Sequence, residues 1–175
     1  MNIEVERLSD RGEPFAHTYG PGELMLDDED VRQCADAAVE GLASRKRDEV
    51  RLRGTIKAGV EVACDRCLTT INRPVEIEFD TTFVHASAAN SLGENVELQP
   101  DDLLLDFYEG ETLNVDDLVR EQILLALPMH SLCNDECKGL CPDCGANLNA
   151  GEHVCERREI DPRWAALAEL RRDQE

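Results

Sequence analysis

The stretch from Cys133 to Asn149 constrains this chain more than any other part of its sequence. It reads CNDECKGLCPDCGANLN and places Cys133, Cys137, Cys141 and Cys144 in a C-x3-C-x3-C-x2-C array. In the C-P-D-C-G part, proline and glycine make the tight reversal that brings two thiolates onto one ion. So short a stretch has no room for a core that would order four free thiols. We therefore predict one closed four-thiolate site, which suits structural zinc and leaves no open position for a substrate.

Length and charge limit the remaining possibilities. The chain has 175 residues, a formal charge of −20 and eight cysteines. A charge of this sign excludes nucleic-acid binding by overall electrostatic attraction, so any RNA contact must be local. The N-terminus is polar, and no apolar run approaches the roughly 20 residues that span a bilayer. We expect a soluble, cytoplasmic protein without membrane contact, in which cysteines are metal ligands or buried thiols rather than disulfides.

A long antiparallel hairpin is the clearest secondary-structure signal. Apolar residues occupy every second position from Val50 to Val62, and a second alternating run extends from Val75 to Phe83. The tip between them holds a second C-x-x-C motif, made by Cys64 and Cys67. A redox function is disfavoured because strands flank this motif, whereas redox cysteines begin a helix in a thioredoxin-like βαβ unit.

The tip cysteines can also be metal ligands. Cys64 and Cys67 would then join Cys141 and Cys144 on one ion as a split zinc ribbon. This alternative competes with the self-contained site between Cys133 and Cys144.

The other periodic segments complete the predicted fold. A helical stripe begins at Val31 and is expected to end near Ala37, while residues 39–43 read equally well as a strand leading into a hairpin. A strand is expected at residues 103–107, a helix covering the sheet at 113–127, and a short helix after Asp161.

These elements indicate an α+β fold. We predict a mainly antiparallel sheet with a long central hairpin and one covering helix, followed by a Cys-rich zinc module and a short helix. The expected domains are an α+β core at residues 1–128 and a zinc-binding module at 129–175 that packs on the core.

Four motifs of this chain resemble those of the YceD family, the large ribosomal RNA subunit accumulation proteins of bacteria and plastids. They are C-D-R-C-L (64–68), E-Q-I-L-L-A-L-P (121–128), C-K-G-L-C-P-D-C-G-A-N-L-N (137–149) and D-P-R-W-A-A-L (161–167). The resemblance covers residues 50 to 170. It implies metal binding, nucleic-acid binding and a role in 23S rRNA accumulation or processing during large-subunit assembly. Some members keep only the hairpin C-x-x-C, which favours the self-contained site, with Cys64, Cys67 and Cys155 as alternate ligands.

A basic stretch stands out in this acidic chain. The stretch from Arg45 to Arg73 contains eight basic and four acidic residues. Its net charge is therefore +4, against −24 for the remainder of the chain. Alternation places Arg51, Arg53 and Lys57 on one side of the predicted strand, and Arg66 at the tip extends the row. We predict that these four residues contact RNA phosphates. Alternatively, they form a solvated strand face that protects a sheet edge.

An enzyme is the least favoured class of function. The four histidines are scattered, and the sequence has neither a phosphate-binding loop nor a nucleophile elbow. We expect a non-catalytic ribosome biogenesis factor that binds rRNA or the pre-ribosomal large subunit and takes no small-molecule substrate. The alternative is an acidic adaptor or chaperone for a basic ribosomal protein.

Overall fold

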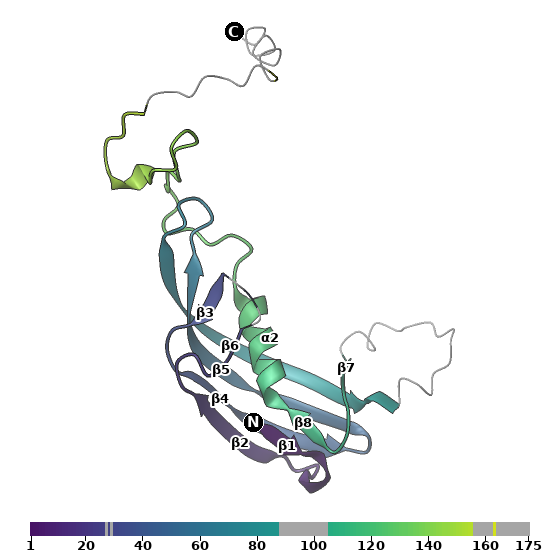
Figure 1. Cartoon of the computed structure of the whole chain (residues 1–175). Helices are drawn as coiled ribbons and strands as arrows, with labels where there is room; N and C mark the ends of the chain where they lie inside the picture. The colour runs from purple at the N-terminus through teal and green to yellow at the C-terminus, as the bar shows by residue number, and fades with distance from the viewer. Residues whose placement is uncertain (27, 29, 88–104, 156–162, 164–175) are drawn as a thin grey trace.

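The computed structural model describes residues 1–26, 28, 30–87, 105–155 and 163. They form a curved sheet with the helix α2 lying across one face, and an irregular segment that extends from one end of the sheet (Figure 1). No helix in these ranges is long and apolar enough to cross a membrane. Apart from Arg163, the helix predicted after Asp161 lies outside the described residues. In chain order the elements are β1 (Asn2–Glu4), η1 (Val5–Arg7), β2 (Glu13–Tyr19), β3 (Val31–Gln33), β4 (Ala37–Lys46), β5 (Glu49–Ala63), β6 (Thr70–His85), β7 (Leu105–Tyr108), β8 (Thr112–Asn114), α2 (Val115–Ala126) and η3 (Leu148–Ala150).

The long hairpin predicted from the sequence is confirmed. Strands β5 and β6 pair antiparallel along their whole length, with Val50 opposite Phe83 near the open end and Val62 opposite Ile71 near the tip. Alternate side chains of β5, including Leu52, are buried, while their neighbours lie on the other face of the sheet. The hairpin therefore carries the core on one face and solvated side chains on the other.

The sheet is mixed rather than purely antiparallel. Its strand order is β2-β4-β5-β6-β7, and β3 pairs with the tip half of β5. The β6–β7 pair is parallel, whereas the other pairs in this sheet, within the described ranges, are antiparallel. Strands β1 and β8 form a separate antiparallel pair. The prediction of a mainly antiparallel α+β fold with one helix is thus confirmed in outline, with this correction to the sheet.

The helix predicted from Val31 to Ala37 is wrong, and the strand alternative for residues 39–43 is confirmed. The structure has strand β3 followed by strand β4. Both strands pair with β5 and bury alternate side chains, including Val31, Gln33 and Val39. Because pairing and burial decide the conformation of short apolar runs, tertiary contacts override the helical spacing here.

Two glycines allow β4 and β5 to approach closely. Gly41 of β4 lies opposite Gly54 of β5. A Cβ atom at either position would collide with a backbone carbonyl group of the facing strand, that of Arg53 or that of Glu40. A larger residue would therefore push the two central strands apart.

The helix α2 covers the sheet, as predicted. The Asn114 side chain accepts a hydrogen bond from the backbone N–H of Asp116 at 3.0 Å and caps the helix. The Asp116 carboxylate also accepts the Tyr19 hydroxyl at 2.6 Å and pairs with the amino group of Met1. These contacts fix the start of α2 against β1 and β2. The buried residues of α2 are Val115, Leu118, Val119 and Ile123.

Candidate metal centres

Two cysteine pairs that lie far apart in the sequence meet at the tip of the β5–β6 hairpin. Cys64 and Cys67 belong to the turn of the hairpin, and Cys133 and Cys137 belong to the segment after α2. The four sulfur atoms all lie within 4.8 Å of one another. The Cys64 and Cys137 sulfurs are 3.9 Å apart, and those of Cys67 and Cys133 are 3.7 Å apart. We call these four residues the tip cluster.

Hydrogen bonds hold the hairpin turn against the segment after α2. The Asp65 N–H donates to the Ser131 carbonyl oxygen at 2.9 Å, and the Ser131 N–H donates to the Asp65 carboxylate at 2.8 Å. The Arg66 guanidinium donates to the carbonyl oxygens of Cys137, at 2.9 Å, and Asp135, at 3.4 Å. The chain therefore brings the four thiols together through its own polar contacts.

The thiols of the tip cluster differ in their tendency to ionise. Burial acts to raise the pKa of Cys64, but the backbone N–H groups of Cys67, Cys133 and Arg66 outweigh it and lower this pKa to about 6. By contrast, the hydrogen bond with Cys137, followed by burial, raises the pKa of Cys133 to about 12. Thiols this close cannot all ionise without a cation between them, and a divalent ion would remove that repulsion.

A second cluster lies further along the chain. Cys141 and Cys144 flank the C-P-D-C-G turn, where Gly145 has a φ of 76° and donates its N–H to the Cys141 carbonyl oxygen at 2.8 Å. His153 and Cys155 complete the group, and its four ligand atoms lie within 4.8 Å of one another. The Cys144 sulfur is 3.2 Å from Nε2 of His153. We call these four residues the knuckle cluster.

The thiols of the knuckle cluster show the same contrast. The backbone N–H groups of Cys144 and Asp143 lower the pKa of Cys141 to about 6. The hydrogen bond with Cys144, followed by burial, raises the pKa of Cys155 to about 11. Here too, a cation among the ligands would allow all the thiols to ionise together.

The structure does not bring the four predicted zinc ligands onto one ion. Cys133 and Cys137 join the hairpin cysteines, whereas Cys141 and Cys144 join the histidine and cysteine that follow them. The split ribbon, which would pair the hairpin cysteines with Cys141 and Cys144, is not formed either. The three alternate ligands named from the sequence, Cys64, Cys67 and Cys155, all lie in a cluster.

His153 is the cluster residue that the sequence analysis missed. It lies nine residues after Cys144 and two before Cys155, so the sequence carries an H-x-C pair behind the C-P-D-C-G turn. That pairing of a histidine with a nearby cysteine was the available signal. Cys34, by contrast, belongs to neither cluster and is half-buried.

The donor atoms of both clusters could hold a metal ion. The tip cluster offers four sulfurs, and the knuckle cluster offers three sulfurs and one imidazole nitrogen. Four soft donors suit zinc or iron–sulfur chemistry, whereas calcium and magnesium take oxygen ligands.

The residues predicted to contact RNA do not form an uncompensated basic row. Arg51 donates two hydrogen bonds to the Asp80 carboxylate, at 2.6 and 2.5 Å, and Lys57 pairs with Glu76 at 2.9 Å. Hydrogen bonding to Arg51 holds the pKa of Asp80 below its usual range. Arg66 supports the tip cluster, as described above. Arg53 forms no ion pair with another described residue and lies in the field of the Asp80 carboxylate.

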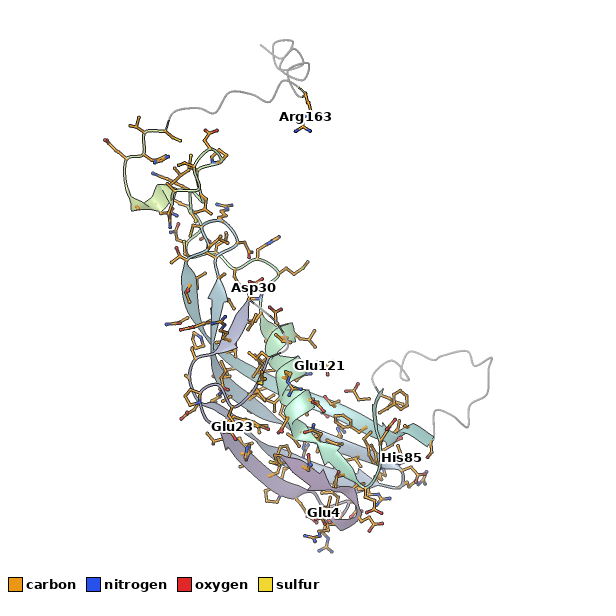
Figure 2. All side chains as sticks on the ribbon, viewed as in Figure 1. Glu4, Glu23, Asp30, His85, Glu121 and Arg163 are labelled. Atoms are coloured by element: carbon orange, nitrogen blue, oxygen red, sulfur yellow. The ribbon has the colours of Figure 1, made fainter. Side chains whose placement is uncertain are left out.

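An acidic cleft with a volume of about 310 Å³ lies between α2, β7 and β8. Phe83, Phe107 and Tyr108 line it, and Phe107 is 56% exposed. Four carboxylates and no lysine or arginine line the cleft within the described chain. One of them, Glu121, projects from the outer side of α2 (Figure 2). The four acidic residues are Asp106, Glu109, Asp117 and Glu121.

Curated relatives of the chain occur in bacteria and in plant chloroplasts. An uncharacterized protein of Mycobacterium tuberculosis is 30% identical over 178 residues, which cover 97% of this chain and 81% of the relative. The uncharacterized protein YlbN of Bacillus subtilis is 26% identical, over 95% of this chain and 92% of the relative. The chloroplastic large ribosomal RNA subunit accumulation protein YCED homolog 1 of Zea mays is 29% identical, over 67% of this chain and 47% of the relative.

No solved structure matches the chain. The family model described as "Large ribosomal RNA subunit accumulation protein YceD" matches residues 52–171, a range that contains both clusters. The chain therefore belongs to the YceD family.

Proposed function

We propose that this protein is a non-catalytic, cytoplasmic factor that promotes accumulation of 23S rRNA during assembly of the large ribosomal subunit. The observation that carries the proposal is the family match over residues 52–171, together with the names of the chloroplast relatives. A direct test is the ratio of 23S to 16S rRNA in cells that lack the protein. The ratio should fall, and the intact chain should restore it. An unchanged ratio would contradict the proposal.

We propose zinc as the ion of the tip cluster. Four thiolates complete the tetrahedral shell that structural zinc prefers, so the bound ion would have no position for a substrate. The ion would join the hairpin turn to the segment after α2, which also links the proposed domains on either side of residue 128. This supports a structural role for the metal.

The acidic cleft favours contact with a basic protein, the adaptor function that ranked second from the sequence. Asp117 already pairs with Arg120 at 2.6 Å, but the other three carboxylates attract lysine and arginine side chains, and the exposed aromatic ring can pack against such a cation. The partner that fits this chemistry is a basic ribosomal protein or a basic segment of the pre-ribosomal large subunit.

Capture of tagged protein after nuclease treatment tests this mode. A basic ribosomal protein should remain bound, and the double variant Glu109→Gln/Glu121→Gln should lose it. The matched control is Glu136→Gln/Glu152→Gln, which removes the same charge from two exposed residues outside the cleft. Equal capture by both double variants would contradict a role for the cleft.

RNA contact through Arg51, Arg53, Lys57 and Arg66 is the second candidate, and the position of Arg53 supports it. Binding of phosphate would have to displace Asp80 from Arg51 and Glu76 from Lys57. If RNA is the partner, nuclease should abolish capture. The triple variant Arg51→Gln/Arg53→Gln/Lys57→Gln should then flatten the salt dependence by about one unit of log–log slope per lost phosphate contact.

A further inference from the structure

We propose that the knuckle cluster is a second zinc site, built from three thiolates and one imidazole, and that the chain holds two zinc ions in separate sites. The inference rests on the geometry of the described residues and does not depend on the ribosomal role. It assigns Cys141, Cys144, His153 and Cys155 to one ion, and it gives His153 a function.

The four ligand atoms of the knuckle cluster lie close enough together to share one ion. They come from four different residues and lie within 4.8 Å of one another, so one point between them can be reached by all four. The Nε2 atom of His153 faces the Cys144 sulfur at 3.2 Å. Three thiolates with one histidine are a recurrent structural zinc set.

The C-P-D-C-G turn presents its two sulfurs as a zinc knuckle does. Gly145 adopts the left-handed conformation and returns its N–H to the Cys141 carbonyl oxygen. The Cys141 N–H donates to the Ala146 carbonyl oxygen at 2.8 Å, and Leu140 and Asn147 form an antiparallel bridge beneath the turn. The turn is therefore closed by its own backbone, and a zinc ion would attach His153 and Cys155 to it.

The residues between the clusters keep the two sites apart. Only three residues separate Cys137 from Cys141, yet these cysteines belong to different clusters. The Gly139 carbonyl oxygen accepts the Leu148 N–H at 2.9 Å, and the Lys138 N–H donates to the Asn149 side chain at 2.9 Å. These bonds fix the residues between Cys137 and Cys141 against the segment that follows the C-P-D-C-G turn.

Asn149 also helps to keep the two sites apart, through a hydrogen bond to a sulfur atom of the tip cluster. Its side-chain amide donates to the Cys137 sulfur at 3.3 Å. Cys137 therefore receives a hydrogen bond from a residue that follows the C-P-D-C-G turn, while its sulfur stays with the tip cluster. This is the outer support that metal thiolates usually have.

Zinc content of the full chain, purified without added metal, tests the proposal. We expect two zinc ions per chain, one for each cluster. The variants His153→Ala and Cys155→Ser should each retain one, and so should Cys64→Ser, which disrupts only the tip cluster. The matched controls are His17→Ala and Cys34→Ser, a histidine and a cysteine outside both clusters, and each should retain two.

Three outcomes would overturn the proposal. The first is a single zinc ion in the unaltered chain. The second is retention of two ions by His153→Ala or Cys155→Ser. The third is iron in place of zinc.

A measurement on the unaltered chain avoids any folding defect of the variants. Long-range proton–nitrogen NMR correlations report the side-chain nitrogens of each histidine. Removal of zinc by a chelator should shift Nε2 of His153 and leave the nitrogens of His17 in place, since His17 lies on β2, remote from both clusters. An unchanged Nε2 resonance of His153 would overturn the proposal independently of the zinc count.

Discussion

The two clusters differ in how the chain assembles them. The ligands of the tip cluster come from the hairpin turn and from the segment after α2, and paired cysteines are as many as 73 positions apart in the sequence. The knuckle cluster takes all of its ligands from residues 141–155. A metal in the tip cluster would close a long loop of chain, whereas a metal in the knuckle cluster would order a short one. Although the two clusters have similar donor atoms, a metal in the tip cluster should therefore affect the stability of the protein very differently from a metal in the knuckle cluster.

Loss of the tip cluster should have the largest effect. In the double variant Cys64→Ser/Cys67→Ser, the metal can no longer link the hairpin to the segment after α2. We expect the midpoint of thermal unfolding to fall by about 10 °C or more, since loss of a structural metal is among the most destabilising of changes. Calorimetry of the zinc-loaded variant and wild type measures this. A fall no larger than that of a knuckle variant would contradict the difference between the clusters.

The hydrogen bonds of Asp65 should matter less, but still measurably. Asp65→Ala removes the carboxylate that accepts the Ser131 N–H and leaves this partly buried donor without its partner. We expect a loss of about 1 to 3 kcal/mol in the free energy of unfolding, measured by urea titration. Asp143→Ala, in the knuckle turn, is the matched control and should be close to neutral. Equal losses in both variants would contradict a stabilising role of the Asp65 hydrogen bonds at the tip of the hairpin.

Loss of the knuckle cluster should have only a local effect. The double variant Cys141→Ser/Cys144→Ser should lose amide protection at residues 138–155, while the β5–β6 hairpin keeps its protection. The thermal midpoint should change by less than about 3 °C, because these ligands lie outside the main core. Hydrogen exchange followed by mass spectrometry resolves the two regions. Deprotection of the hairpin would mean that the clusters act as one unit.

The paired charges on the open face of the sheet should contribute least to stability. Arg51 and Lys57 are exposed and pair with carboxylates of the neighbouring strand. Replacing both by Gln should leave the unfolding midpoint nearly unchanged, because solvent screens such pairs. Thermal unfolding monitored by circular dichroism is sufficient to test this. A clear drop would show that the ion pairs help to hold the central strands together.

The sequence predicted the elements whose periodicity is long. The alternation on both sides of the tip gave the hairpin, and the apolar stripe from residue 113 onward gave α2, where the Asn114 cap and Pro128 mark the ends. The stripe after Val31 failed because it is short, and short apolar runs take the conformation of the strand they pair with. The pairing of opposite charges could also have been predicted from the sequence, since Glu76 and Asp80 alternate along β6 as the basic residues do along β5.

The sequence identified the cysteines of the candidate site but not their grouping. Spacing alone predicts that neighbouring cysteines such as Cys137 and Cys141 share one ion. Their assignment to different clusters depends on how the tip of the hairpin docks on the segment after α2, and on the hydrogen bonds of Asp65 and Arg66 that fix this contact. Such long-range contacts have no local signature. The basic row likewise depends on partners contributed by a separate strand.

X-ray absorption at the zinc edge of the unaltered, full chain tests the two-cluster division most directly. Sulfur and nitrogen ligands are resolved by their distances, about 2.3 Å for zinc–sulfur and about 2.0 to 2.1 Å for zinc–nitrogen. One four-sulfur site and one site with three sulfurs and a nitrogen predict an average shell of three and a half sulfurs and half a nitrogen per zinc. A shell of four sulfurs with a single zinc per chain would contradict the division.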